Sequence, residues 1–280
     1  MKSEREVLEK VLNIAMVDDD IKAVCMNGSR VNKNIEPDNY QDFDIAFLVG
    51  HYEMFIQKLS FIHDFGESII SQCNRVYSKD GIKDQLFYML LFKDYIRIDF
   101  RFIPIEYFDD YKEEDQLLEV LVDKTGKFKD VSKPSEETYH IKKPTEKDFR
   151  ECCNEFWWIS TYVIKGIKRE EIFYAIEHLN IMREMLFELL DWKVGYQYDW
   201  KVSTGKNHKL LKRYITEEEW NLLTKSYPKG NINDITCVLN TLIEQFYELS
   251  QETSNLLDFN LDFKEANNIK EYINKQLKNE

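Results

Sequence analysis

The sequence predicts an α+β fold in which an N-terminal mixed β-sheet flanked by helices is followed by a C-terminal helical bundle. Three observations support this prediction. Short β-prone segments fill the first part of the chain, and long segments of helical periodicity fill the second. Between them, residues 125–144 concentrate Lys, Pro, Ser and Thr, as a connecting loop does. We therefore expect two domains, at 1–135 and 136–280, since 280 residues suffice for two modest cores.

The first domain begins with apolar residues at helical spacing behind Ser3, a plausible N-cap. The clearest later signal is a hairpin, in which β-prone residues 86–92 lead to a Lys93-Asp94 turn and residues 95–103 return in alternation. The remaining expected elements are a helix at 3–17, a strand at 23–26, a loop at 31–41, a strand at 43–49, a short helix at 52–59 and a strand at 117–122.

The second domain is predicted to be entirely helical. Its expected helices span 145–165, 168–193, 205–226, 232–257 and 261–278, and all five tryptophans of the chain lie in this half. Adjacent Cys152 and Cys153 are expected to pack in its core.

The bulk composition excludes several classes of protein. The formal net charge is −13, whereas a protein that follows a nucleic-acid backbone carries a basic face, so no nucleic-acid partner is expected. An acidic surface attracts cationic small molecules, although solubility alone also explains it. No apolar run approaches a membrane span or a secretory signal. Five cysteines without Cys-x-x-Cys spacing suit a reducing cytoplasm, and we expect a monomer or weak homodimer.

The strongest chemical pattern is Gly28-Ser29, followed after 12 residues by Asp42-Phe43-Asp44. Side chains alternate between the faces of a strand, so Asp42 and Asp44 project to one side, about 7 Å apart, while Phe43 enters the core. Two such carboxylates can share a hard cation such as Mg²⁺, which prefers oxygen ligands.

A third carboxylate is expected on a later strand. In residues 96–102 the apolar side chains share one face, and Arg97, Asp99 and Arg101 share the other. A central Asp is unfavourable in a strand, and a metal ligand role for Asp99 explains it. Arg97 and Arg101 are interpreted as ordinary salt-bridge partners on an exposed face.

Enzymes that catalyse phosphoryl-group displacement use such sets of carboxylates to hold magnesium ions. The Gly28-Ser29 turn offers backbone N–H groups and a hydroxyl to phosphate oxygens, and Arg30 is placed to assist with phosphate charge. A Gly-Ser pair or an Asp-x-Asp alone carries little information. Their combination with a later strand Asp is much rarer and favours a catalytic site.

This arrangement resembles the polymerase-β-type nucleotidyltransferase superfamily. Five short sequence motifs, found in both predicted domains, are similar to those of the aminoglycoside 6-adenylyltransferases. The similarity runs across nearly the whole chain. The motifs are Gly-Ser-Arg-Val-Asn, Tyr-Gln-Asp-Phe-Asp-Ile, Cys-Cys-Asn-Glu-Phe-Trp, Tyr-Val-Ile-Lys-Gly and Asp-Trp-Lys-Val-Gly.

The resemblance implies transfer of AMP from ATP to the 6-hydroxyl of streptomycin, with release of pyrophosphate and resistance to the antibiotic. Ser29, Asp42, Asp44 and Asp99 match the family's nucleotide and metal positions, and Mg²⁺ is the implied cofactor. The implied partners are ATP and a cationic aminoglycoside. The C-terminal end is short for the family, which leaves contacts of the tail open.

The helical domain is expected to bind the acceptor. Glu177 lies in a largely apolar helical stretch, where partial burial would raise its pKa and suit it to act as general base. It could equally bind a guanidinium of the substrate or pair with Arg183 or Lys168. Activation by the metal at Asp99 is an alternative that does not exclude the first.

Further binding residues are expected near the tryptophans and in a basic turn. Glu155 and Trp158 could contact a polyhydroxylated cation through charge and stacking, although Trp at helical spacing is more often core. His178 is interpreted as a hydrogen-bonded structural residue. Lys206, at the expected start of a helix, could reach the triphosphate, and a solvated basic turn is the alternative.

Two other functions remain open from the sequence. The same chemistry could act on another small-molecule or protein hydroxyl, because the carboxylates report only on the nucleotide half of the reaction. The second open function is that of a nucleotide-binding module without turnover. Loss of a metal-binding carboxylate would mark such a module, whereas Asp42, Asp44 and Asp99 are all present.

Overall fold

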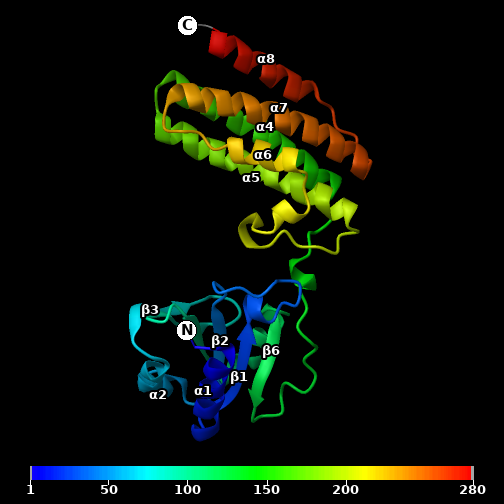
Figure 1. Ribbon diagram of the computed structural model, residues 1–280. Coiled ribbons are helices and arrows are strands. Elements are labelled where there is room, and N and C mark those ends of the chain that lie inside the picture. The colour runs from blue at the N-terminus through cyan, green and yellow to red at the C-terminus, as the bar shows by residue number, and fades with distance from the viewer. Residues whose placement is uncertain (1, 279–280) are drawn as a thin grey trace. The chain divides into compact units, whose positions relative to one another are not determined.

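The computed structural model describes residues 2–278, and the chain divides into two units, Met1–Thr138 and Tyr139–Glu280 (Figure 1). The first unit contains a mixed β-sheet with helices on its faces, and the second is helical. This arrangement confirms the predicted α+β class. Among the described residues, no helix combines the length and the apolar character needed to cross a membrane.

The first unit is organised around a six-stranded sheet with the order β3-β4-β5-β2-β1-β6. Only β2 and β5 pair in parallel; the other neighbours are antiparallel. The strands are β1 (Ile21–Asn27), β2 (Phe43–Val49), β3 (Ser68–Tyr77), β4 (Asp84–Phe92), β5 (Arg97–Pro104) and β6 (Leu118–Asp123). The parallel pair places Asp44 beside Asp99, although the two residues are far apart in the sequence.

One face of the sheet carries the larger apolar core. Phe43, Ile45 and Phe47 of β2 are buried there, as strand alternation predicts. Apolar residues of α1 (Glu4–Val17), α2 (Tyr52–Phe55) and the 3₁₀ segment η2 (Leu59–Phe65) cover this face. Helix α1 begins at a capping box between Ser3 and Glu6, which satisfies the first free backbone N–H groups.

The opposite face is covered only in part. Ala46 and Leu48 of β2 pack there against Phe108 and Tyr111 of α3 (Phe108–Glu114) and against Phe128. This second core lies toward the carboxyl end of β2, whereas Asp42 and Asp44 lie at its amino end. The covering helix therefore stops short of the carboxylates.

The second unit is a bundle built mainly from long helices. Its helices are α4 (Glu146–Lys168), α5 (Ile172–Gln197), α6 (Glu217–Lys225), α7 (Ile232–Leu257) and α8 (Lys264–Lys278). Phe156 of α4 stacks on Phe246 of α7 with ring centroids 3.6 Å apart. The close approach of α4 to α5 depends on Gly166, since a Cβ atom there would lie 2.9 Å from that of Ala175. Cys152 and Cys153 are buried in the same core.

Four parts of the chain differ from the sequence prediction. Strand β3 and helix α3 were not predicted. The helix expected at 52–59 is the single turn α2. The helix expected at 205–226 is wrong in its first half, because Asn207 and His208 have positive φ and only α6 is a true helix. Short 3₁₀ segments take up other connections, at Gly28–Arg30 (η1), Ile105–Tyr107 (η3), Glu137–Tyr139 (η4), Lys206–His208 (η5) and Leu211–Arg213 (η6).

Candidate active site

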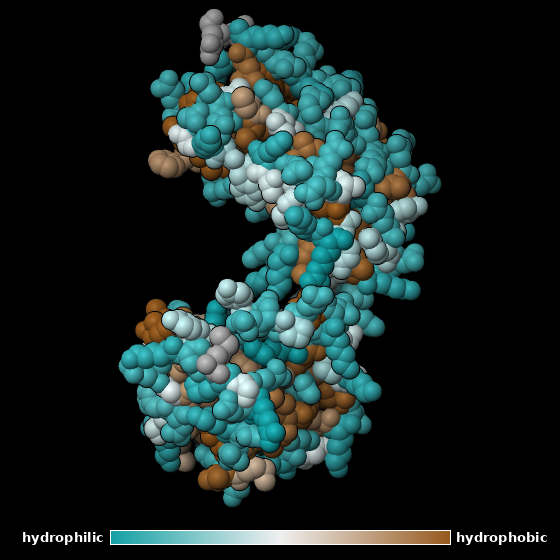
Figure 2. Space-filling model, in the orientation of Figure 1, coloured by the Kyte–Doolittle hydropathy of each residue, from teal (hydrophilic) through white to brown (hydrophobic). Residues whose placement is uncertain are grey.

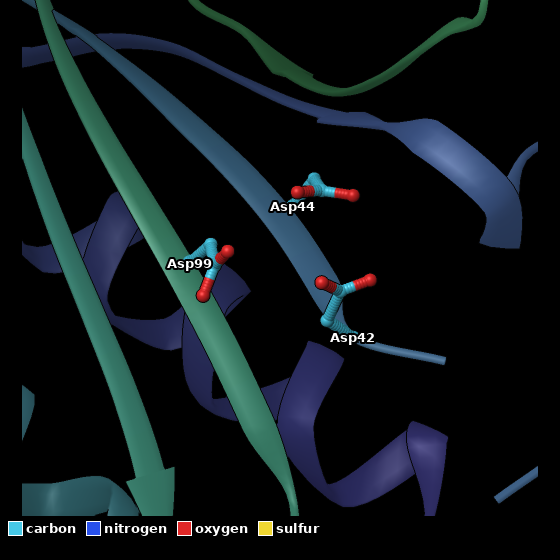
Figure 3. A group of neighbouring side chains, drawn as sticks. All are labelled: Asp42, Asp44 and Asp99. Carbon is cyan, nitrogen blue, oxygen red and sulfur yellow. The ribbon is translucent and has the colours of Figure 1, made fainter. Parts of the chain in front are cut away.

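Three aspartates gather on the open face of the sheet (Figure 3). Asp42 immediately precedes β2, Asp44 lies on β2, and Asp99 is the direct neighbour of Asp44 on β5. One carboxylate oxygen of each residue lies within 4.8 Å of the others. All three side chains are half-buried, so the strands and not solvent set their positions.

The charge of this cluster is only partly balanced. Arg97 donates from Nε to Asp99 Oδ1 at 2.9 Å and from a terminal nitrogen to Asp99 Oδ2 at 2.6 Å. The same guanidinium lies 3.7 Å from Asp42 Oδ2. Burial raises the pKa of Asp44 to about 7, and the charges of Asp42 and Asp99 add to that effect. One cation therefore does not neutralise three carboxylates.

These residues fit a divalent metal ion. The donor set consists of carboxylate oxygens, the ligand type that Mg²⁺ selects, and the oxygens converge closely enough to share one ion. Burial and the charges of Asp42 and Asp99 raise the pKa of Asp44, and a bound cation would favour its ionised form. Asp42, Asp44 and Asp99 are thus the residues that would hold Mg²⁺.

The turn between β1 and β2 closes against the same cluster. Gly28 has φ +78°, and a Cβ atom there would lie 2.2 Å from Oδ2 of Asp44. Only glycine permits both this backbone conformation and this approach. The half-buried Ser29 follows directly in η1. The turn is thereby fixed on the β1 side of Asp44.

Arg30 is engaged by its own loop. It donates to the backbone carbonyl oxygens of Asp42 and Gln41, at 2.9 and 2.8 Å, and to Glu4 at 3.0 Å. Its guanidinium also lies 3.7 Å from the centroid of the Phe43 ring. These contacts hold the loop end against β2, so the structure gives Arg30 a positioning role beside the phosphate role expected from the sequence.

Glu177 lies on α5 of the second unit, and its side chain is exposed. The expectation that Glu177 is locally buried is therefore wrong, because Ala175 and Leu179 face the bundle while Glu177, like Phe173 one turn earlier, faces solvent. Burial thus gives no support to its role as general base. A contact with Asn180 at 3.5 Å is its one described hydrogen bond.

Glu155 and Trp158 occupy the exposed side of α4. The Trp158 indole donates to the hydroxyl of Tyr162 at 2.9 Å, and the Tyr162 ring meets that of His178 on α5 edge to face. His178 in turn contacts the Tyr174 carbonyl through Nδ1 at 2.7 Å. An aromatic row thus runs from Trp158 to the turn of α5 that bears Glu177, whereas Trp157 is core.

Lys206 is exposed in η5, a three-residue 3₁₀ turn. The expectation that Lys206 begins an α-helix is wrong, because Gly205 and Asn207 both have positive φ and break the helical path. No helix dipole therefore supports anion binding at this position. Lys206, Glu155, Trp158 and Glu177 belong to the second unit, whereas Asp42, Asp44 and Asp99 belong to the first.

Arg97 forms the salt bridge expected of it on the exposed face of the sheet, and its partner is Asp99. Its proximity to Asp42 was not predicted, because it depends on the parallel pairing of β2 with β5. Arg101, two residues further, does form the ordinary contacts expected of it, with Glu114 at 2.6 Å and Gln85 at 2.5 Å.

Known proteins match this chain over most of its length. A family model described as streptomycin adenylyltransferase matches residues 1–276. A protein from Campylobacter jejuni named aminoglycoside 6-adenylyltransferase is 37% identical over 261 residues, which cover 92% of this chain and 91% of that protein. A protein of the same name from Staphylococcus aureus is 33% identical over 284 residues and covers both chains completely, at 100% each.

A solved structure is similar as well. The crystal structure of an aminoglycoside 6-adenyltransferase from Bacillus subtilis covers 99% of this chain and 100% of its own, with a TM-score of 0.50 and 29% sequence identity. Sequence and structure comparisons thus span both units.

Proposed function

We propose that this chain, which belongs to the streptomycin adenylyltransferase family, transfers AMP from ATP to the 6-hydroxyl of streptomycin and releases pyrophosphate. The observation that carries the proposal is the cluster of Asp42, Asp44 and Asp99 within a chain that the family matches over residues 1–276. Its relatives are named as adenylyltransferases of aminoglycosides. Resistance to the antibiotic is the biological outcome that this reaction would give.

The cluster supports the nucleotide half of the reaction. Mg²⁺ held by Asp42, Asp44 and Asp99 would neutralise the triphosphate and stabilise the departing pyrophosphate. Gly28 brings backbone N–H groups close to Asp44, where phosphate oxygens can accept from them, and Ser29 adds a hydroxyl. Arg30 keeps the end of the loop in place through its carbonyl contacts.

The reaction forms one bond and breaks one. The acceptor oxygen attacks the α-phosphorus of ATP, the bond from that phosphorus to the bridging oxygen breaks, and pyrophosphate leaves with the electron pair. The hydroxyl proton passes to a carboxylate or to solvent. Asp99 is the cluster residue that we assign to orient this hydroxyl, because Glu177 lacks the burial that would favour it as base.

Charge supports the choice of acceptor. The chain has a net charge of −13, which favours approach of a cationic aminoglycoside. In the second unit, exposed Glu155 and Glu177 could pair with amino or guanidino groups, and Trp158 could stack on a sugar ring. These residues are proposed as acceptor contacts, and Lys206 as a contact of the nucleotide.

Mass spectrometry tests the proposal directly. After incubation of streptomycin with the protein, ATP and Mg²⁺, the drug should gain one AMP moiety, and fragmentation should place it at the 6-position. Asp42→Asn should reduce the rate by about 1,000-fold or more, as removal of a central electrostatic group does. Asp80→Asn, in an exposed turn, is the matched control and should keep full activity.

The outcomes separate the alternatives. AMP transfer to a different aminoglycoside or to a protein hydroxyl, but not to streptomycin, would change the acceptor and keep the chemistry. ATP binding without product for any acceptor would instead indicate a nucleotide-binding module. Full activity of Asp42→Asn would overturn the assignment of the site.

A further inference from the structure

The strand register extends the row of catalytic carboxylates across the sheet. Asp44 on β2 lies beside Asp99 on β5, Asp99 beside Met89 on β4, and Met89 beside Gln72 on β3. Paired residues on neighbouring strands point to the same face. Met89 and Gln72 therefore project on the face that bears the carboxylates.

A second row runs parallel to the first. Arg97 on β5 lies beside Leu91 on β4, and Leu91 lies beside Ile70 on β3. Met89, Leu91, Ile70 and Gln72 thus form one continuous surface, which we call the β4–β3 shelf. Met89 and Leu91 are half-buried, Gln72 is exposed, and Ile70 is 66% exposed. Figure 2 shows apolar side chains gathered over the β3 end of the first unit.

The shelf is closed at one end only. In the next row Arg101 contacts Glu114 of α3 and lies over the Phe87 ring at 5.3 Å, which fills the face beside α3. At the other end, the side chains of Arg97 and Ile70 are 51% and 66% exposed, so the surface is accessible to solvent there. The open surface therefore begins at the carboxylates and extends about 10 Å across two strands, at the usual strand spacing.

The position of the Gly28 turn decides which substrate this surface faces. Gly28 abuts Asp44 from the β1 side, so a triphosphate held by the turn lies on that side of the cluster. In-line displacement requires the attacking and leaving oxygens to lie on opposite sides of the phosphorus. The attacking hydroxyl must then come from the β5 side, where the shelf starts.

We propose that the β4–β3 shelf binds the part of the acceptor next to the attacked hydroxyl, an inference that rests on the proposed adenylyl transfer. The chemistry fits a polyhydroxylated cationic ring. Met89, Leu91 and Ile70 offer apolar contact to the C–H face of such a ring, and the Gln72 amide can both accept from and donate to its hydroxyl or amino groups. The shelf thus sets acceptor specificity and leaves the nucleotide untouched.

Lysine substitutions on β3 test the shelf without disturbing the core, since the altered side chains are exposed. Gln72→Lys and Ile70→Lys place a positive charge on the shelf. Ser71→Lys is the matched control, because Ser71 is also exposed and projects to the opposite face, and the substitution adds the same charge. Initial rates with the full chain, Mg²⁺, ATP and streptomycin give separate KM values for the two substrates.

Gln72→Lys and Ile70→Lys should each raise the KM for streptomycin about tenfold through like-charge repulsion, with the KM for ATP unchanged. Ser71→Lys should match the unmodified chain. If both shelf variants behave as Ser71→Lys does while the unmodified chain is active, the shelf inference is wrong and the proposed function stands. Equal rises in both KM values would also overturn it. An unmodified chain that adenylylates no acceptor would overturn the function and the shelf together.

Discussion

At the scale of single residues, the surroundings of Asp44 oppose the ionised form of its carboxyl group. Burial and the neighbouring carboxylates raise its pKa to about 7 from the ordinary value of 3.8. The folded chain therefore binds a proton at Asp44 more readily than the unfolded chain does. This contribution to stability is present below about pH 3.8 and is lost as the pH rises through 7.

The expected consequence is a conflict between stability and function at Asp44. In EDTA at pH 8, Asp44→Asn should unfold at a higher temperature than the unmodified chain, by roughly 2–5 °C, because one repelling charge is gone. At pH 5 the difference should shrink, since Asp44 is then mostly protonated. Added Mg²⁺ should raise the unfolding temperature of the unmodified chain more than that of the variant. Differential scanning calorimetry gives all these values.

Gly28 offers a second test at the same scale. Gly28→Ala adds a Cβ atom 2.2 Å from Asp44 Oδ2 at a positive φ, so the turn or the carboxylate must shift. We expect kcat/KM to fall about 100-fold, as displacement of a catalytic group by an ångström does. Gly81→Ala is the control, because Gly81 shares a positive φ of +66° but has no atom within 4 Å of its added Cβ. Similar losses in the two variants would attribute the effect to backbone strain alone.

At the scale of elements, prediction succeeded where one face of a segment is buried. Phe43 and Ile45 alternate with Asp42 and Asp44, so β2 and its two faces follow from the sequence. Helix α7 likewise has a buried apolar stripe and a clear N-cap at Asn231. In both elements the local pattern and the tertiary environment agree.

Elements without such a pattern were missed. Strand β3 is exposed on both faces and owes its structure to its pairing with β4, which no local periodicity records. Arg75 of β3 forms salt bridges with Asp84 of β4 and with Glu53. These contacts form only when the chain folds, so they leave no local pattern in the sequence. The break at Asn207 and His208 depends on backbone angles that polar residues adopt without a marked sequence signal.

The same reasoning explains what was predicted of the site. Asp42, Asp44 and Asp99 stand out because each interrupts or borders a strand with an acid. Arg97 and the β4–β3 shelf do not, because their relation to the cluster depends on which strands are neighbours and in what register. The exposure of Glu177 depends on which side of α5 faces the bundle, and the apolar residues around it suggested the wrong side.

At the scale of the whole molecule, the net charge of −13 predicts a salt effect on the acceptor. Raising KCl from about 0.05 M to about 0.3 M shortens the screening length and should raise the KM for streptomycin severalfold. The KM for ATP should not rise in parallel, since the acidic surface repels an anion and screening relieves that repulsion. Steady-state rates at constant free Mg²⁺ measure both. A KM for streptomycin that is independent of KCl would contradict long-range attraction.

The parallel pairing of β2 and β5 also has a consequence for the newly made chain. Asp44 and Asp99 become neighbours only after the hairpin of β3 and β4 has been crossed and β5 has joined β2. Such a long-range contact closes late, because its loop entropy must be overcome first. A nascent chain from which β2 but not β5 has emerged therefore exposes Asp42 and Asp44 without Asp99, and its cation site is incomplete. A cation bound by all three carboxylates would therefore report that β5 has joined β2, a step that does not require β6, the last strand of the sheet in chain order.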